Sequence, residues 1–66
     1  MIETFGQRLK RIRKEKDLKQ VELAKKTGLT KSQIGEYERD IHEPSVSRFE
    51  WLCKALDVTA SELLGF

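Results

Sequence analysis

The fold is decided by residues 20–38, which read QVELAKKTGLTKSQIGEYE. The first part, residues 20–27, places apolar side chains at helical spacing and stops at Gly28, the residue type that most often closes a helix in the left-handed conformation. The last part predicts a second helix over about residues 31–38. Because only about three residues remain for the connection, and one of them is a glycine, the stretch predicts two helices joined as a helix-turn-helix.

The start of the second helix is the clearest local signal in the chain. Thr30 and Gln33 have the spacing of a capping box, in which each side chain bonds the backbone amide of the other residue. Leu29 and Ile34 stand where a hydrophobic staple would hold the incoming chain. The first helix is marked less well, because Lys19 replaces the usual Ser or Thr cap, at a cost of about 1 kcal/mol.

Three more helices are expected around this motif, and no segment shows the period-2 alternation of a strand. The helix starts are marked by capping-box pairs at Thr4 with Gln7 and at Thr59 with Glu62, and by a cap at Ser45 or Ser47. Two apolar stripes at helical spacing support the first and the fourth helix: Phe5, Leu9 and Ile12, and Phe49, Leu52, Cys53 and Leu56. They predict a helix from Phe5 to about Lys16, another that begins near residue 46, and a last short one. We therefore expect one compact, all-α domain of five helices over residues 1–66.

The composition excludes several classes of protein. With 66 residues, one cysteine and one histidine, the chain has no internal disulfide, no four-ligand zinc site and no room for an enclosed cofactor. It offers no nucleophile with a paired base and no phosphate-binding loop, so we do not expect the chain to be an enzyme. We also expect it to bind no cofactor, no metal ion and no small-molecule substrate. No apolar run is long enough for a membrane span or a signal peptide, which points to the cytoplasm.

The charges are distributed unevenly along the chain. Residues 1–20 carry seven basic and three acidic side chains, whereas residues 41–66 carry two basic and four acidic ones. The formal net charge of +2 therefore hides a basic N-terminal third that suits an anionic partner.

The predicted second helix of the motif has two different faces. Ile34 and Tyr37 lie on one of them, and the opposite face carries no large apolar side chain but holds Lys31, Ser32, Gly35, Glu36 and Arg39. Gly35 costs the helix about 1 kcal/mol relative to alanine, and the missing side chain lets a bulky group approach the backbone. In a DNA major groove, Lys31 can donate to guanine, Ser32 can pair with several base edges, and Glu36 can accept from cytosine.

The chain resembles a known family. Gln20-Val21-Glu22-Leu23-Ala24, Gly28-Leu29-Thr30, Ile34 and Tyr37-Glu38 follow the pattern of the lambda-repressor-like (Cro/Xre) helix-turn-helix family, and so do Pro44-Ser45, Ala55-Leu56-Asp57-Val58 and Leu63-Leu64. The resemblance covers residues 5 to 64. It implies a five-helix domain whose third helix enters the major groove of double-stranded DNA, usually as a homodimer on a palindromic operator.

The resemblance also implies roles for individual residues. The base-reading positions are Lys31, Ser32 and Glu36, with Gln33 at the edge, and the positions along the sugar-phosphate backbone are Gln20 and Arg39. Lys19 departs from the family's Ser or Thr cap but adds a cation near the DNA backbone. Gln20 would also brace the third helix. Arg13 and Glu38 match an ion pair that holds that helix in many members, although two unpaired surface charges are the alternative.

Several positions leave alternatives open. Asp40 stands where the family commonly has glycine, and aspartate tolerates the left-handed conformation better than most residues. Glu36 either reads a base or is repelled by phosphate and turned aside. Trp51 covers the edge of the core or packs on a partner subunit, while Leu64 and Phe66 are candidate dimer contacts unless Phe66 folds back. Cys53 is expected in the core, and His42 in a loop.

Two functions remain in competition. The first is a sequence-specific transcriptional regulator, most simply a repressor, of the phage, restriction-modification or sporulation and stress type. The second is an antitoxin or adaptor that uses the same fold to bind a protein, which the weak net charge and Glu36 favour slightly.

Overall fold

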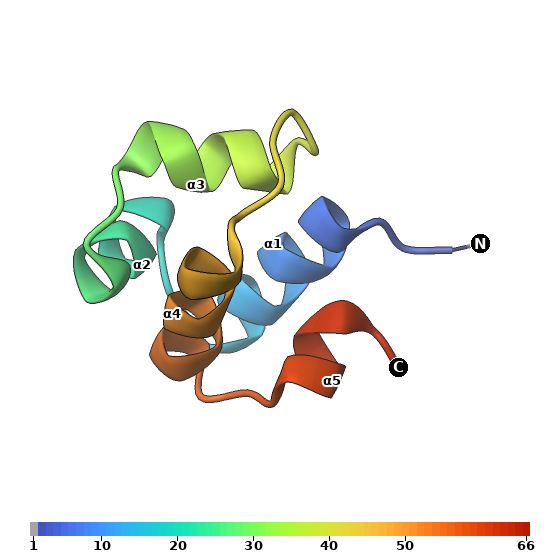
Figure 1. Cartoon of the computed structure of the whole chain (residues 1–66). Coiled ribbons are helices and arrows are strands. Elements are labelled where there is room, and N and C mark those ends of the chain that lie inside the picture. Colours follow the sequence, from blue (N-terminus) through green and yellow to red (C-terminus); the bar gives the residue numbers. More distant parts are fainter. Residues whose placement is uncertain (1) are drawn as a thin grey trace.

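The computed structural model describes residues 2–66 and shows five helices in this range, with no strand among them. The helices are α1 (Phe5–Glu15), α2 (Gln20–Thr27), α3 (Lys31–Glu38), α4 (Val46–Leu56) and α5 (Ala60–Leu64), as Figure 1 shows. The predicted all-α, five-helix fold is confirmed, and α2 and α3 form the helix-turn-helix with the predicted bounds.

Four of the five helices begin at a Ser or Thr side chain that caps the first turn. The Thr30 hydroxyl accepts a hydrogen bond from the Gln33 amide at 3.1 Å, and the Gln33 side chain accepts one from the Thr30 amide at 2.9 Å. The same reciprocal box is present at Thr4 and at Thr59. For α4, Ser45 and not Ser47 is the cap, because its hydroxyl accepts from the Arg48 amide at 3.2 Å.

The α2 helix begins at Gln20 without a side-chain cap from Lys19. Half of a capping box compensates, since the Glu22 carboxylate accepts a hydrogen bond from the Lys19 amide at 2.8 Å. At its other end Gly28 has a φ of +77°, the left-handed conformation expected for this position. These local bonds explain how the motif forms despite its weak start.

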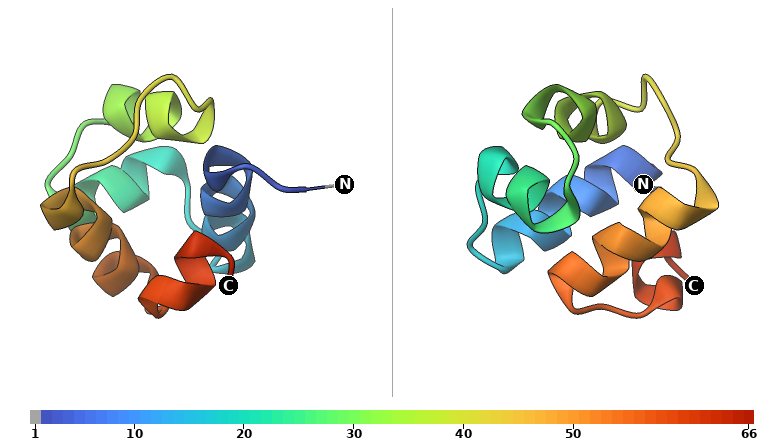
Figure 2. Two further views of the ribbon diagram at one scale, coloured as in Figure 1. Left: turned by 45° about the vertical axis from the view of Figure 1, so that its right-hand side comes forward. Right: turned by 60° about the vertical axis from the view of Figure 1, so that its left-hand side comes forward.

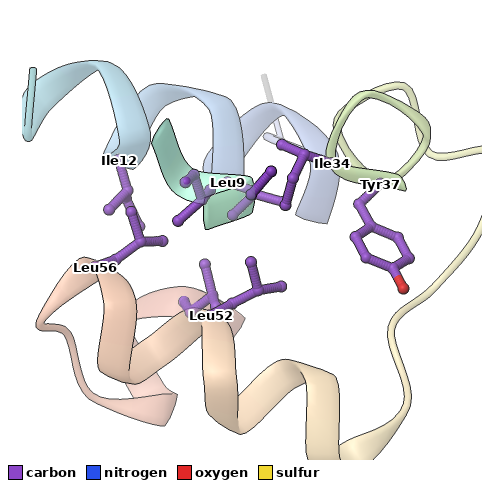
Figure 3. Packing of buried hydrophobic residues seen from close by; sticks show 9 residues of the cluster. Leu9, Ile12, Ile34, Tyr37, Leu52 and Leu56 are labelled. Atoms are coloured by element: carbon purple, nitrogen blue, oxygen red, sulfur yellow. The ribbon is translucent and has the colours of Figure 1, made fainter. Parts of the chain in front are cut away.

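Among residues 2–66, nine buried apolar side chains build the core, and every helix contributes to it. They are Leu9 and Ile12 of α1, Leu23 and Ala24 of α2, Ile34 and Tyr37 of α3, Leu52 and Leu56 of α4, and Leu63 of α5 (Figure 3). Cys53 is only partly buried and packs against this cluster from the side, so the expectation of a core position for it is too strong. Such a core tolerates little truncation, since removing one buried leucine side chain typically costs 2–5 kcal/mol.

The α3 helix packs on α1 and α2, while α5 packs on α1 and α4. In the views of Figures 1 and 2, α3 lies across one end of the molecule and α5 lies at the opposite end. The outer face of α3 is therefore not covered by the C-terminal helix. None of the helices in residues 2–66 has the length and apolar character needed to cross a membrane.

Gly6 lies where α1 closely approaches the C-terminal end of α3. A Cβ atom at this position would lie 2.5 Å from the carbonyl oxygens of Tyr37 and Glu38 and 2.8 Å from the Asp40 carboxylate. Only glycine allows this approach, which fixes the C-terminal end of α3 against the first turn of α1.

Candidate nucleic-acid interface

The inner side of α3 is held by a buried ion pair between Arg13 and Glu38. The Arg13 Nε atom lies 2.6 Å from Glu38 Oε2, and the side chains are only 8% and 3% exposed. A second bond joins Arg13 Nη2 to Glu38 Oε1 at 3.1 Å, and Gln20 Nε2 donates to the same oxygen at 3.0 Å. Of the two alternatives for Arg13 and Glu38, the structure has the ion pair, and it places Gln20 as a brace between α2 and α3.

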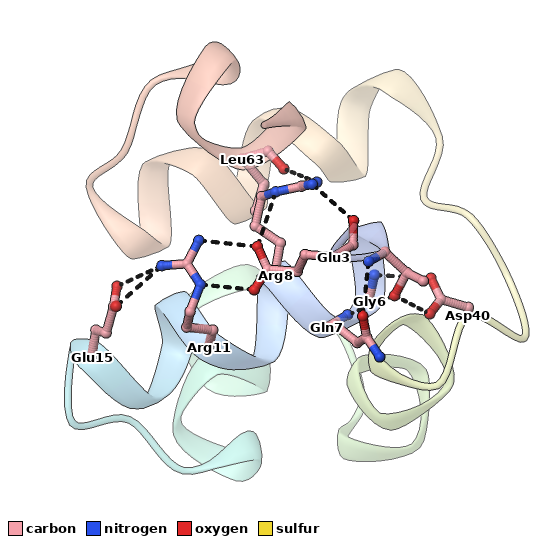
Figure 4. A network of polar contacts seen from close by, with 9 residues as sticks. Glu3, Gly6, Gln7, Arg8, Arg11, Glu15, Asp40 and Leu63 are labelled. Atoms are coloured by element: carbon pink, nitrogen blue, oxygen red, sulfur yellow. Dashed lines mark hydrogen bonds and ion pairs between the residues drawn. The ribbon is translucent and has the colours of Figure 1, made fainter. Parts of the chain in front are cut away.

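Asp40 provides a second attachment, which the sequence did not reveal. Its φ is +60°, the left-handed conformation expected there, and this turns its side chain towards the start of α1. The carboxylate accepts hydrogen bonds from the Gly6 amide at 2.9 Å and from the Thr4 hydroxyl at 2.6 Å (Figure 4). The conformational tolerance of aspartate was visible in the sequence, but its bonding partners were not.

The outer side of α3 forms an open hollow that collects most of the expected DNA-contacting residues. It is lined by Gln20, Lys31, Ser32, Gly35, Glu36 and Arg39. Gln33 and Lys19 do not line it, and the Gln33 side-chain oxygen is engaged by the Thr30 amide. The hollow therefore combines cations, a hydroxyl, an amide and one carboxylate on an uncovered helix face.

The glycine in the sequence suggested an empty space at the centre of this hollow, but in the structure a side chain lies there. The Arg39 guanidinium lies over Gly35, with Nη1 3.3 Å from the point that a Cβ atom of residue 35 would occupy. Gln20 Nε2 is 3.8 Å from the same point. The space beside Gly35 is thus occupied by the side chain of Arg39, which follows the same helix.

A neighbouring hollow contains residues that the sequence analysis did not connect with the site. It is lined by Gln33, Glu36, Tyr37, His42, Glu43 and Arg48. His42 Nε2 lies 4.0 Å from Glu36 Oε2, and Arg48 Nη1 donates to the Tyr37 hydroxyl at 2.9 Å. Glu36 lines both hollows, and nothing in the spacing of the sequence indicated that His42 and Arg48 would come near it.

The basic excess of residues 1–20 is partly neutralised within the domain. Arg11 bonds both Glu3 and Glu15, and Arg8 lies 3.4 Å from Glu3, so these charges form a network on α1 (Figure 4). The Arg11 guanidinium holds the pKa of the Glu3 carboxyl below its usual value. Within residues 2–66, by contrast, Lys31 and Arg39 have no ion-pair partner. The cations left for an external anion therefore include those on the outer face of α3.

The three candidate dimer contacts fall in different surroundings. Leu64 and Phe66 are 44% and 89% exposed, so Phe66 does not fold back onto its own domain. Leu64 lines an apolar groove with Phe5, Glu43, Pro44, Ser45, Val46 and Phe49. Trp51, 45% exposed, lines a separate hollow together with Lys26 and Lys54.

In the part of the chain that the structure describes, no group of three or more histidine, cysteine, aspartate or glutamate side chains is placed to hold a metal ion.

Known proteins share this architecture. A family model described as helix-turn-helix matches residues 9–63. The immunity repressor of Bacillus phage phi105 is 45% identical over 62 residues, which cover 94% of this chain and 43% of that protein. The chain spans about half the length of the curated relatives it matches.

Two solved structures resemble this chain closely. The restriction-modification controller protein C.AhdI of Aeromonas hydrophila is 41% identical with a TM-score of 0.86, over 89% of each chain. SinR, the master regulator for biofilm formation of Bacillus subtilis, in complex with DNA, is 40% identical with a TM-score of 0.86, over 92% of this chain and 98% of that one.

Proposed function

The chain belongs to the helix-turn-helix family, in its lambda-repressor-like (Cro/Xre) group, and from this premise we propose that it is a sequence-specific DNA-binding regulator of transcription. Its function is repression, by occupying an operator in double-stranded DNA. The names of its relatives, which include an immunity repressor, support this proposal.

The observation that carries the proposal is the contrast between the two sides of α3. The inner side is fixed by the Arg13–Glu38 pair and by Ile34 and Tyr37 in the core. The outer side is uncovered and carries unpaired cations and hydrogen-bonding groups around Gly35. A helix of this shape fits the major groove, whose floor presents donors and acceptors and whose walls are phosphates.

On this proposal, the outer face of α3 reads base edges. Lys31 donates to guanine O6 and N7, and Ser32 pairs with a neighbouring base. Glu36 accepts from cytosine N4, and Gln33 contributes at the edge of the site while its side-chain oxygen serves the cap. Lys19 and Gln20, at the start of α2, bind phosphate and fix the register of the helix on the duplex.

We further propose that the protein acts as a homodimer on a palindromic operator. The apolar groove lined by Leu64, Val46 and Phe49 is open to solvent, and Val46 is 77% exposed. A second copy of the chain would cover it through a two-fold interface, to which Phe66 adds an exposed aromatic ring. Two symmetric domains would then present two α3 helices to two half-sites, which is the reason for a palindrome.

The test is selection of bound sequences from a random duplex pool, followed by affinity measurements on a panel of single-base variants of the selected site. We expect a palindromic site, and a loss of preference at one position in each half-site for Lys31→Ala. For Lys19→Ala we expect a similar loss on every sequence and a salt dependence reduced by about one counterion.

Two results would contradict the proposal. The first is a wild-type protein that binds no duplex at low salt, which would favour the antitoxin or adaptor alternative. The second is a Lys31→Ala variant that selects the same sequences as the wild type. Thermal unfolding of each variant serves as the control for the fold.

A further inference from the structure

The side chain of Arg39 runs back along α3 instead of outwards from its end. Arg39 directly follows the last residue of α3, yet its Cζ and Nη1 atoms lie 3.9 Å and 3.3 Å from the Cβ position of Gly35, one helical turn earlier. Side chains on a helix point towards its N-terminus, so a long side chain at this end naturally reaches the preceding turn. The guanidinium is thereby carried to the middle of the outer face.

Gly35 leaves room for this close approach. A Cβ atom at residue 35 would lie 3.3 Å from Arg39 Nη1, so the guanidinium would have to shift by a few tenths of an ångström, and a longer side chain would compete for its place. Gln20 Nε2 lies 3.8 Å from the same Cβ position. Lys31, Ser32 and Glu36 line the same hollow. Arg39 therefore shares its surroundings with the residues that face base edges, although its backbone lies at the end of the helix.

We propose that Arg39 is a specificity-determining residue that reads a guanine in the major groove from its position over Gly35. This inference rests on the proposed function and departs from the backbone contact that the family resemblance implies for Arg39. A planar guanidinium donates two parallel hydrogen bonds to guanine O6 and N7, the commonest specific contact between proteins and DNA.

The surroundings of the guanidinium favour this role over a phosphate contact. Phosphates line the walls of the groove, whereas the middle of the outer face of an inserted helix meets its floor. Glu36 lines the same hollow and supplies an acceptor beside the donors of Arg39. A G·C pair presents the complementary pattern, with acceptors on guanine and the N4 donor on cytosine.

The experiment measures the affinity of the wild type, Arg39→Ala and Arg39→Lys for the selected operator and for a panel in which each base pair is replaced in turn. We expect Arg39→Ala to bind the operator roughly 5- to 150-fold more weakly, and to lose discrimination at one G·C pair only. Arg39→Lys keeps the charge but not the planar fork, so it is expected to recover only part of that discrimination.

Two further variants sharpen the test. Gly35→Gln, which places a good helix former in the space of the guanidinium, is expected to reduce discrimination at the same base pair while the protein stays folded. Lys54→Ala removes one positive charge beside Trp51, away from the α3 hollow, and is expected to leave the discrimination unchanged.

A uniform loss of affinity across the panel for Arg39→Ala, with the salt slope reduced by about one, would show a phosphate contact and overturn the inference alone. Failure of the wild type to bind any duplex would overturn the proposed function together with it. The two failures are thus distinguished by the wild-type protein, and far-ultraviolet circular dichroism verifies that each variant is folded.

Discussion

The Asp40 carboxylate accepts a hydrogen bond from the backbone amide of Gly6 at 2.9 Å, so a residue two positions beyond the end of α3 also satisfies the first turn of α1. The same carboxylate accepts a bond from the Thr4 hydroxyl. Two segments far apart in the sequence are joined in this way at the point where Gly6 allows their backbones to approach. The end of the helix-turn-helix motif is therefore anchored to the first helix and not left as a free loop.

Substitution of Asp40 separates its two contributions. Glycine would adopt the left-handed conformation without strain but would lose both hydrogen bonds, so we expect Asp40→Gly to be destabilised by about 1–2 kcal/mol. Asp40→Ala is expected to lose more, because alanine also disfavours a positive φ. Urea unfolding measures both values, and an Asp40→Gly protein as stable as the wild type would show that only the backbone conformation matters.

Removal of one partner of the Arg13–Glu38 pair leaves the other charge buried. We expect Arg13→Met or Glu38→Leu alone to destabilise the domain by about 3–5 kcal/mol, enough to unfold much of a protein of this size. The double variant, which replaces both charges by apolar groups, should recover most of that loss. Thermal unfolding of the wild type, the two single variants and the double variant forms a double-mutant cycle. A double variant that is destabilised by the sum of the two single effects would count against an energetically coupled pair.

The α5 helix carries a pH-dependent cap. The Thr59 amide, which donates to Glu62 at 3.0 Å, holds the pKa of that carboxyl below its usual value of 4.5. Because the pKa is lowered in the folded state, the stabilisation is present above about pH 4.5 and is lost as the pH falls through the lower folded value.

Glu62→Gln tests this cap, since glutamine serves the same position in the boxes at Thr4 and Thr30. We expect the melting temperature of the variant to fall less steeply than that of the wild type between about pH 5 and about pH 3. Identical pH profiles would mean that Glu62 does not contribute to acid sensitivity.

Leu64 and Trp51 provide a matched pair for locating the dimer interface. Both are large and nearly half exposed, but only Leu64 lines the apolar groove. We expect Leu64→Ser to weaken self-association by about tenfold or more, and Trp51→Ser to have little effect. Sedimentation equilibrium measures both constants; the opposite order would place the interface on the hollow around Trp51.

Local signals were sufficient to predict the helices, because capping boxes and the left-handed glycine act within one turn of the chain. The boxes at Thr4, Thr30 and Thr59 are all present as expected. The choice between Ser45 and Ser47 could not be made from the local sequence, because Ser47 has Glu50 at capping-box spacing and yet Ser45 is the cap in the structure.

The contacts that position the site depend on tertiary structure and were only partly predictable. Arg13 and Glu38 were expected to pair because of a family pattern, not because of their spacing. The bonds of Asp40 to α1, the close approach at Gly6 and the placement of Arg39 over Gly35 all join residues whose proximity appears only after packing. The sequence showed a glycine in the centre of α3, but not which side chain would use the space.

The two sides of α3 carry different residues, and this affects which of its side chains can be substituted without loss of the fold. The groups that attach the helix, Glu38, Tyr37 and Ile34, point inwards, while Lys31, Ser32 and Glu36 line its outer surface. Gln20 of α2 contacts both sides, through its bond to Glu38 and its place in the outer hollow. On the proposed function, the outer side chains of α3 could therefore be exchanged for those of another regulator while the core and the Arg13–Glu38 pair stay the same, so that the sequence read on DNA would change and the fold would not.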